Sequence, residues 1–315
     1  MTDPVIHGLS NEAYHHEAPY SEYLSSSQLK IYSRSPKAAK FALDNPTEEK
    51  SDALRFGSLF HDCMAALAEG GLLEHVLDAI AAFEPPINEK TGQPYGSTTK
   101  AYAAAYEKFT AELNGVLAST AEEKELVSAM LNSLLYGSGA TSEQVRKLLK
   151  WAKATEVSYF YETEDGIKLK VRPDLLTRSK IVDWKTCSLD SLDEDGIARQ
   201  IIKYRYDVSL AMYQWTIFQI EKKWYAPILV FVQKQEPFDC VMCDISEWCY
   251  QYFPDEDFVK PGVGAMEFRK LLDLHTECVR NNEWPGAENS IEADGDTRIM
   301  KPAVPYWLGM KYFEI

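Results

Sequence analysis

The sequence predicts a mixed α/β fold, and three features of its patterning support that prediction. Apolar residues in the first half of the chain recur with helical spacing. From about residue 156 the spacing changes to alternation, which is typical of strands. A long helical segment then separates these strands from two later ones. Strands joined both by a hairpin and by a helical crossover form a mixed sheet with helices packed on it.

The first half of the chain is predicted to be mainly helical. Residues 1–20 carry aromatics, histidines and a proline and are expected to form an irregular arm. Ser25–Gln28 would cap a short helix that ends near Ser35–Pro36. A second helix is expected from Gly57 through Leu67, and the prolines and glycines of residues 84–98 predict a loop. Three more helices are predicted at 99–114, 120–136 and 142–151.

The second half supplies the strands. Residues 156–161 and 167–171 are predicted to pair across a turn at 164–166, and residues 179–186 to form a third, short strand. A helix is expected over 194–219, because apolar residues repeat there at spacings of four and three. That buried stripe consists of Ile197, Ile201, Tyr204, Val208, Ala211, Trp215 and Phe218. Strands at 224–233 and 238–245 and a helix at 262–282 complete the prediction.

The length of 315 residues allows one large domain or one domain with a helical annex. We expect an N-terminal arm and short helix over residues 1–56. An α/β core would occupy residues 57–245, with a helical insertion at about 84–150. Residues 246–315 are expected to form an acidic helical region packed on that core.

The net charge of −15 argues against a uniformly basic protein, yet the charge is unevenly distributed. Residues 145–186 contain ten Lys and Arg against six Asp and Glu, and residues 25–42 contain four basic residues and no acidic one. Residues 244–300 contain five basic and thirteen acidic residues. A local site for phosphate groups is therefore compatible with the composition.

Several features predict a cytoplasmic protein without a membrane partner. The longest apolar run, Trp224–Val232, is far shorter than the ~20 residues of a membrane span. Met1–Pro4 lack the basic and apolar regions of an export signal. Six cysteines in a chain of this length do not form a disulfide scaffold, which favours a reducing compartment.

Charged residues cluster at the second and third predicted strands. Asp174 ends the second strand, and Asp183-Trp184-Lys185 lies in the third. If these strands are neighbours, both carboxylates and the lysine converge at one end of the sheet. Two close carboxylates repel each other unless a cation lies between them, and Mg²⁺ is the expected cation. Asp183 and Lys185 would share a strand face, so Lys185 could neutralise a phosphodiester under attack by water.

These residues resemble the motif of the PD-(D/E)XK nuclease superfamily, and their surroundings resemble its RecE-like (exonuclease VIII type) branch. The core motif is Pro173-Asp174 followed by Asp183-Trp184-Lys185. Further similar segments are Gly57–His61, Glu156–Tyr159, Tyr204–Val208, Gln235–Phe238, Tyr14-His15, Ser26–Lys30 and Ser35-Pro36. The resemblance implies a restriction-endonuclease-like α-βββ-α-β core with a mixed sheet and extra helices.

The resemblance also implies roles for individual residues. Asp174 and Asp183 would be metal ligands and Lys185 catalytic, with the backbone carbonyl of Trp184 as a further ligand. Glu156 would be an outer carboxylate and His61 a ligand or positioning group. Candidate DNA contacts are Lys30, Arg34, Arg172, Arg205, Tyr206, Ser209 and Tyr213. Ser209 departs from the branch, which usually has Gln four residues before that Tyr, and this puts substrate binding in doubt more than metal chemistry.

By resemblance, the chain would be a Mg²⁺-dependent 5′→3′ exonuclease on linear double-stranded DNA, with Mn²⁺ as a substitute metal. The expected setting is phage or prophage recombination beside a single-strand annealing protein. A homo-oligomer, by resemblance a ring-shaped tetramer, would fit processive digestion.

Other interpretations stay open. Cys240, Cys243 and Cys249, with the distant Cys63, have the spacing of iron–sulfur PD-(D/E)XK nucleases. However, the separation of three between Cys240 and Cys243 sends their side chains to opposite faces of a strand, so a cluster is disfavoured. A catalytically inactive DNA-end-binding or assembly module with the same fold is a further alternative. Asp174 and Asp183 could also be structural, capping a turn and pairing with Lys185. Glu162 and Glu164 are alternatives to Glu156.

Overall fold

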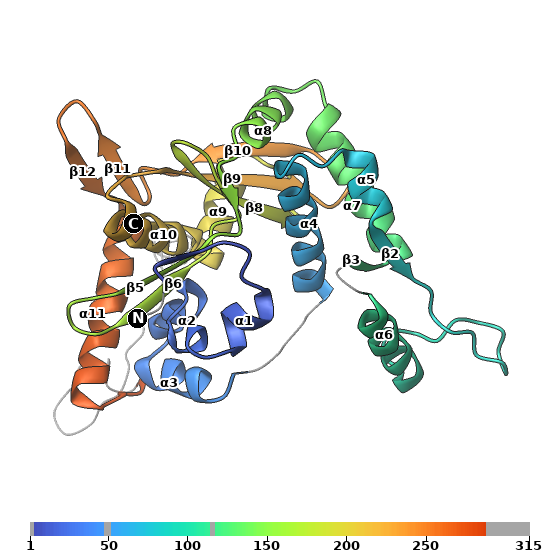
Figure 1. The fold of residues 1–315 in the computed structure, drawn as a ribbon, viewed down its shortest axis with the longest axis horizontal. Coiled ribbons are helices and arrows are strands. Elements are labelled where there is room, and N and C mark those ends of the chain that lie inside the picture. Colours follow the sequence, from blue (N-terminus) through green and yellow to red (C-terminus); the bar gives the residue numbers. More distant parts are fainter. Residues whose placement is uncertain (1–2, 47–51, 114–116, 288–315) are drawn as a thin grey trace, which may run out of the picture. The chain divides into compact units, whose positions relative to one another are not determined.

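Two sheets carry most of the strands in the computed structural model, which describes residues 3–46, 52–113 and 117–287 (Figure 1). The five-stranded sheet has the order β10-β9-β8-β7-β4. Its strands are β4 (Ala154–Thr155), β7 (Leu175–Leu176), β8 (Lys180–Cys187), β9 (Ala226–Gln233) and β10 (Cys240–Asp244). β8 and β9 are parallel and the other neighbours antiparallel, so the mixed sheet predicted from the sequence is confirmed.

The second sheet contains the N-terminal strand. β1 (Val5–Ile6), β5 (Ser158–Glu162) and β6 (Lys168–Val171) pair antiparallel in the order β1-β5-β6. Leu24 also exchanges backbone hydrogen bonds with β6, through Lys168 and Lys170. The expectation of an irregular arm over residues 1–20 is therefore wrong. This segment forms β1 and the helix α1 (Asn11–His16), whose N-terminus is capped by the Ser10 hydroxyl.

Alternation along β8 and β9 separates a core face from a polar face. The side chains of Val182, Trp184, Ile228, Val230 and Val232 join one buried apolar cluster. The helices α4 (Asp52–Ala68), α7 (Ala121–Tyr136) and α8 (Ala140–Lys150) supply the rest of that cluster, including Phe60, Met64, Leu131 and Leu148. Asp183 and Lys185 alternate with this set and therefore point to the opposite face.

The predicted helix over 194–219 is interrupted. The chain forms α9 (Glu194–Tyr204) and α10 (Tyr206–Glu221), with Arg205 between them in the left-handed region at φ 52°. The Arg205 guanidinium bonds the Asp207 carboxylate at 3.0 Å through each of two nitrogens, which supports the break. Tyr204 is consequently 46% exposed, so the prediction that it belongs to a continuous buried stripe is wrong.

Two helix boundaries also differ from the prediction. Residues Ser26–Lys30 form α2, and a 3-10 turn follows over Ile31–Ser33. Ser35 and Pro36 then begin a helix, α3 (Pro36–Asp44), and do not end one, because the Ser35 hydroxyl accepts from the Ala38 amide and proline suits the first helical position. α4 begins at Asp52, five residues before Gly57.

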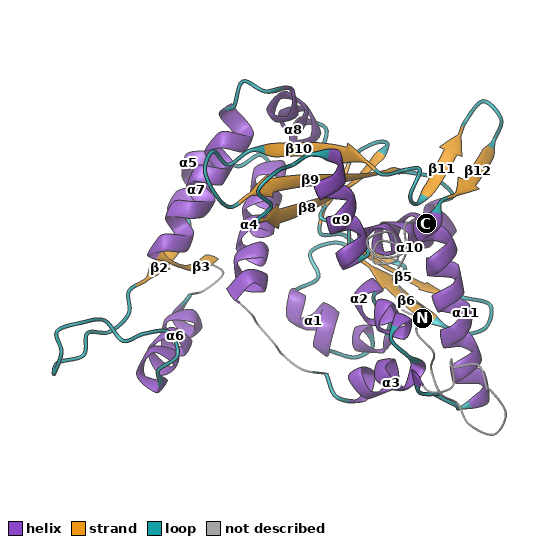
Figure 2. Cartoon of the chain, turned by 180° about the vertical axis from the view of Figure 1, so that it is seen from behind, coloured by secondary structure: helices purple, strands orange, loops and turns teal. Residues whose placement is uncertain are grey.

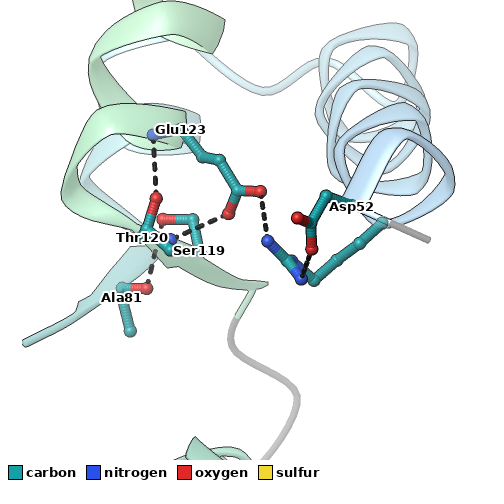
Figure 3. A network of polar contacts seen from close by, with 6 residues as sticks. Asp52, Ala81, Ser119, Thr120 and Glu123 are labelled. Atoms are coloured by element: carbon teal, nitrogen blue, oxygen red, sulfur yellow. Dashed lines mark hydrogen bonds and ion pairs between the residues drawn. The ribbon is translucent and has the colours of Figure 1, made fainter. Parts of the chain in front are cut away.

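A strand pair that the sequence did not indicate joins the start of the predicted helical insertion to its middle. α5 (Leu73–Asp78) leads into β2 (Ile80–Phe83), which pairs in parallel with β3 (Leu117–Thr120), and α6 (Lys100–Glu112) lies between them in sequence. Figure 3 shows how the insertion is tied to α4. Thr120 and Glu123 form a capping box on α7, and the Glu123 carboxylate also binds Arg55 at 2.6 Å. Arg55 binds Asp52 at 2.8 Å as well, so the first turn of α4 is held.

The region beyond residue 245 is not wholly helical. β11 (Tyr250–Phe253) and β12 (Phe258–Pro261) form an antiparallel hairpin before α11 (Val263–Asn281), as Figures 1 and 2 show. The C-terminal part of the acidic region, residues 288–315, lies outside the described residues. None of the helices in the described part of the chain is long and apolar enough to span a membrane.

The chain divides into two compact units. Residues 1–26 and 48–269 form the first, and residues 27–47 and 270–315 the second. This division differs from the boundaries at 57 and 245 expected from the sequence. Within the second unit, the Lys37 amide donates to the Pro285 carbonyl, and the Tyr32 hydroxyl lies 2.7 Å from Nδ1 of His275 and accepts from the Trp284 indole.

The buried His275 should make stability depend on pH. Burial lowers the pKa of His275 to about 4, so below pH 6.5 the unfolded chain takes up a proton that the folded chain does not. The free energy of unfolding should thus fall between pH 6.5 and 4, with His275 contributing up to about 3 kcal/mol. His275→Gln should reduce this dependence in urea titrations followed by tryptophan fluorescence. Identical pH dependence in both proteins would contradict the assignment.

Candidate active site

Strand pairing brings Asp174 and Asp183 opposite each other. Leu175 of β7 pairs with Val182 of β8, so the residue before β7 faces Asp183. One oxygen of Asp174 accepts the Trp184 amide at 2.7 Å. Both carboxylates are buried, with exposed fractions of 8% and 9%. Burial and mutual repulsion would disfavour two such charges, so their environment must compensate for them.

Lys185 compensates Asp183. Its Nζ lies 2.5 Å from Oδ2 of Asp183, as expected for residues two apart on one strand face. Burial opposes the charge on Lys185, but the attraction of Asp183 and Asp174 outweighs it and raises its pKa. Burial, together with the charge of Asp174, raises the pKa of Asp183. The lysine is therefore held as a cation against a carboxylate.

His61 compensates Asp174. The residue lies in α4, and its Nε2 is 2.8 Å from the Trp184 carbonyl oxygen while its Nδ1 is 3.4 Å from Asp174 Oδ1. Burial alone would lower the pKa of His61, but the Asp174 carboxylate raises it overall. Burial raises the pKa of Asp174, and His61 with the other local donors outweighs that effect and lowers it. The imidazole is thus oriented by a backbone carbonyl and a carboxylate.

Glu156 lies beside this pair at a bend in the chain. It falls between β4 and β5 with φ 47°, a left-handed backbone that is uncommon for residues other than glycine, and its amide donates to the Asp174 carbonyl at 3.3 Å. Burial and the charge of Asp174 raise the pKa of Glu156 to about 8. The nearby charges of His61 and Arg172 lower this pKa, but they do not outweigh burial and the charge of Asp174.

A divalent cation fits this donor set. His61, Glu156 and Asp174 each offer one ligand atom, and these atoms lie within 4.8 Å of one another. Among the described residues no other group of three or more His, Cys, Asp or Glu meets that criterion. Asp183 is outside this group, and its carboxylate is paired with Lys185. A cation between the carboxylates would favour the ionised form of Glu156 and so lower its raised pKa.

An aromatic stack continues from Lys185 toward solvent. The Tyr206 ring lies 5.1 Å from Lys185 Nζ, and the Tyr204 ring stacks on Tyr206 with 5.5 Å between centroids. The exposure of Tyr204 could not be predicted, because Tyr204-Arg205-Tyr206 contains neither Gly nor Pro to signal the helix break. Its exposed ring is a direct result of the left-handed Arg205.

Other predicted DNA contacts have varied surroundings. Arg205 is paired with Asp207, and the Ser209 hydroxyl donates to the Arg205 carbonyl. Tyr213 contacts Ser26, and burial keeps its pKa well above the usual range. Lys30 and Arg34 belong to the second unit, where Arg34 is exposed.

Arg172, another predicted DNA contact, makes extensive contacts within the protein. It is 8% exposed, and its guanidinium donates to the Ser158 hydroxyl, the Asn11 amide oxygen and the Leu9 carbonyl. The guanidinium also lies over the Tyr14 ring, 3.9 Å from its centroid. These contacts engage all three guanidinium nitrogens inside the protein and join the N-terminal segment to β5 and β6.

The cysteines of the proposed cluster lie in different settings. Cys63 is fully buried in α4, and the Cys249 thiol donates to the Asp207 carbonyl at 3.3 Å. Cys240 and Cys243 are half-buried on β10. None of the four is in the group of candidate metal ligands found in the described residues.

The mixed α/β fold is that of a PDDEXK-like domain, and nucleases of this class generally use divalent metals. A family model described as "PDDEXK-like domain of unknown function (DUF3799)" matches residues 25–293, and the chain belongs to this family. A crystal structure from Eubacterium rectale, described as a "Putative exonuclease", is similar in fold. The two share 16% sequence identity at a TM-score of 0.52, over 98% of this chain and 99% of that one. No curated protein matches the sequence significantly.

The contacts of Arg172 predict a structural role that can be measured. Arg172→Lys should lower the free energy of unfolding by about 2–4 kcal/mol, because a point charge cannot replace the planar fork and leaves buried acceptors unpaired. Arg178→Lys, at an exposed position, should change it by less than about 0.5 kcal/mol. Urea unfolding measures both. Weakened DNA binding without loss of stability in Arg172→Lys would instead support a role in DNA contact.

Proposed function

We propose that the protein is a divalent-metal-dependent deoxyribonuclease that hydrolyses phosphodiester bonds from the ends of linear double-stranded DNA. The observation that carries this proposal is the convergence of Asp174, Asp183 and Lys185 from adjacent strand positions, with Glu156 and His61 beside them. Membership of a PDDEXK-like family supports the same class of reaction.

The metal would be held by Asp174, Glu156 and His61, with Asp183 and the Trp184 carbonyl adjoining them. When bound, a divalent cation such as Mg²⁺ or Mn²⁺ supplies Lewis-acid stabilisation of the phosphate and a more acidic water. Hard carboxylate oxygens suit Mg²⁺, which keeps several waters and uses few protein ligands.

Lys185 would stabilise the negative charge that develops on the phosphate under attack. It is cationic, buried and fixed by Asp183, so it needs little reorganisation during the reaction. Nδ1 of His61, on the side of Asp174, would be the atom available to the metal, because Nε2 faces the Trp184 carbonyl and fixes the ring. Tyr206, against Lys185, would limit water at the same place and offer a surface for a base.

The finer proposal follows the resemblance to RecE-like nucleases. Digestion would run 5′→3′ and processively, in a homo-oligomer that we propose to be a tetrameric ring. The product strand would pass to a single-strand annealing protein in phage or prophage recombination. Lys30, Arg34, Arg205, Tyr206, Ser209 and Tyr213 are the proposed DNA contacts. An iron–sulfur enzyme with the same carboxylates is a less favoured alternative, since no described cysteine lies with the candidate ligands.

Loss of Lys185 or of the Asp183 charge should remove nuclease activity while the fold remains. Single charged groups at such sites are worth about 10²–10³ in rate, so Lys185→Ala and Asp183→Asn should each reduce hydrolysis by at least that factor. Lys168→Ala, which removes an equal charge from an exposed ion pair, is the matched control. Release of nucleotides from end-labelled linear duplex in Mg²⁺ measures the effect, with closed circular DNA reporting any endonuclease activity.

The alternatives give different results in the same assay. Activity of Lys185→Ala within tenfold of wild type, with unchanged melting, would contradict the active-site assignment. Tight binding of duplex ends by wild type without hydrolysis in Mg²⁺ or Mn²⁺ would identify an inactive DNA-end-binding module. A brown protein with iron absorption would favour the iron–sulfur alternative.

Metal binding can be tested without DNA or catalysis. Glu156→Gln should weaken Mn²⁺ binding by at least about tenfold in titrations followed by electron paramagnetic resonance, because it removes one of three candidate ligand groups. Glu162→Gln makes the same chemical change at an exposed position at the end of β5 and should leave binding unchanged. Equal Mn²⁺ affinity in Glu156→Gln and wild type would exclude Glu156 as a ligand.

A further inference from the structure

A basic pocket is formed by the C-terminal end of α8, the residues before β4 and the turn between β7 and β8. Its volume is about 590 Å³, within the range of sites for small ligands. Five cationic side chains and one indole make up half of its lining residues: Lys147, Lys150, Trp151, Lys153, Arg178 and Lys180. No function proposed above uses any of these residues.

The pocket retains positive charge after its ion pairs are counted. Lys147 pairs with Glu143 at 2.6 Å and Lys153 with Glu221 at 3.6 Å. In the described part of the chain no carboxylate lies within ion-pair distance of the other cations, Lys150, Arg178 and Lys180. In a chain of net charge −15, three cations without a carboxylate partner at one pocket form an unusual concentration.

Ordinary structural roles explain only part of this arrangement. Lys147 and Lys150 lie in the last turn of α8, where cations interact favourably with the helix dipole. Arg178 and Lys180 belong instead to a turn between strands. That turn is fixed, because the Thr177 hydroxyl accepts from the Ser179 and Lys180 amides at 3.3 and 3.0 Å. The second pair of cations is thus held at the pocket by a rigid turn.

Trp151 adds a surface for an aromatic ligand. It follows α8 directly and is 58% exposed, whereas large aromatic side chains usually bury most of their area. Cations around an exposed indole match the two parts of a nucleotide, since phosphates pair with lysine and arginine and bases stack on aromatic rings. An acidic peptide would use the cations but leave the ring without a planar partner.

The pocket and the candidate active site share three strands. Glu156 directly follows β4, Asp174 directly precedes β7 and Asp183 lies on β8, and the three occupy one set of neighbouring positions across these strands. Lys153, Thr177 and Lys180 occupy the set three residues farther along the same strands. With about 3.3 Å per residue, the two sets are roughly 10 Å apart along the sheet. The pocket is therefore near the acidic site yet separate from it.

We propose that this pocket binds single-stranded nucleic acid, with a base stacked on Trp151 and flanking phosphates on Lys150, Arg178 and Lys180. This site would be a second binding site, for a single strand, distinct from the metal site. The choice of nucleic acid as its ligand rests on the proposed nuclease function. Sequence preference is absent, because stacking and phosphate pairing accept any base.

Binding of a labelled 15-nucleotide oligothymidylate to the full chain tests the proposal. Fluorescence anisotropy is measured in chelator, so that no hydrolysis occurs, at several salt concentrations. Trp151→Ala should weaken binding by about 5- to 100-fold, the usual worth of one stacked base. The double reversal Lys150→Glu/Arg178→Glu should weaken binding and flatten the log–log salt slope by about 0.7 for each phosphate that the variant leaves without a cation. Lys90→Glu/Lys260→Glu changes the net charge equally at exposed positions outside the pocket and should have little effect.

Each alternative outcome decides against the proposal. Oligothymidylate affinity that is unchanged in Trp151→Ala and in the pocket reversal would overturn it. An equal decrease in affinity in the Lys90/Lys260 control would show that the loss of binding follows from net charge and not from the pocket. Binding of polyglutamate with the same dependence on Trp151, and no binding of oligothymidylate, would identify an acidic protein partner instead.

Failure of the nuclease proposal would look different. A wild-type protein that hydrolyses no DNA in Mg²⁺ or Mn²⁺, but binds oligothymidylate through Trp151, would retain the pocket and lose the enzyme. The converse result is hydrolysis that depends on Lys185 while oligothymidylate binding is the same in Trp151→Ala and wild type. That result would support the nuclease proposal and reject the pocket proposal.

Discussion

Two buried carboxylates on neighbouring strands, Asp174 and Asp183, set the electrostatic constraint that the surrounding elements satisfy. Removing such charges from water costs several kcal/mol each unless partners compensate. Asp183 is compensated within its own strand by Lys185, whereas Asp174 depends on His61 of α4 and on the Trp184 amide. α4 must therefore approach the backbone of β8 closely. The core packing of α4 and the ion pairs of Arg55 hold it there.

The cationic side chains of residues 145–186 have three kinds of surroundings in the structure. Among the ten cations of residues 145–186, Lys170 and Arg172 are buried and bind backbone and side-chain oxygens of the N-terminal segment. Lys185 is part of the carboxylate cluster. Others, such as Lys150 and Arg178, line the basic pocket. Counting charges along a chain indicates that a phosphate site is possible, but only burial and pairing tell which cations remain available for it.

Much of the central fold could be predicted because its signals are local. Short apolar stretches at residues 179–186 and 224–233 predicted β8 and β9, and the spacing of Asp183 and Lys185 predicted their common face. The β2–β3 pair joins segments far apart in sequence, and no glycine or proline signals the break at Arg205. The β11–β12 hairpin was not predicted either. The approach of His61 to Asp174 joins residues far apart in sequence, so only the family resemblance suggested it.

The candidate site is unequally supported by its strands. β8 has eight residues and is paired on both sides, whereas β4 has two residues, lies at the sheet edge and ends at the left-handed Glu156. Local opening requires less free energy where few backbone bonds must break. Amide exchange should therefore be slow at Asp183 and Lys185 and faster at Glu156. Asp183 and Lys185 are thus held on a firmly paired strand. The Glu156 carboxylate can change its distance to them while the hydrophobic core stays folded.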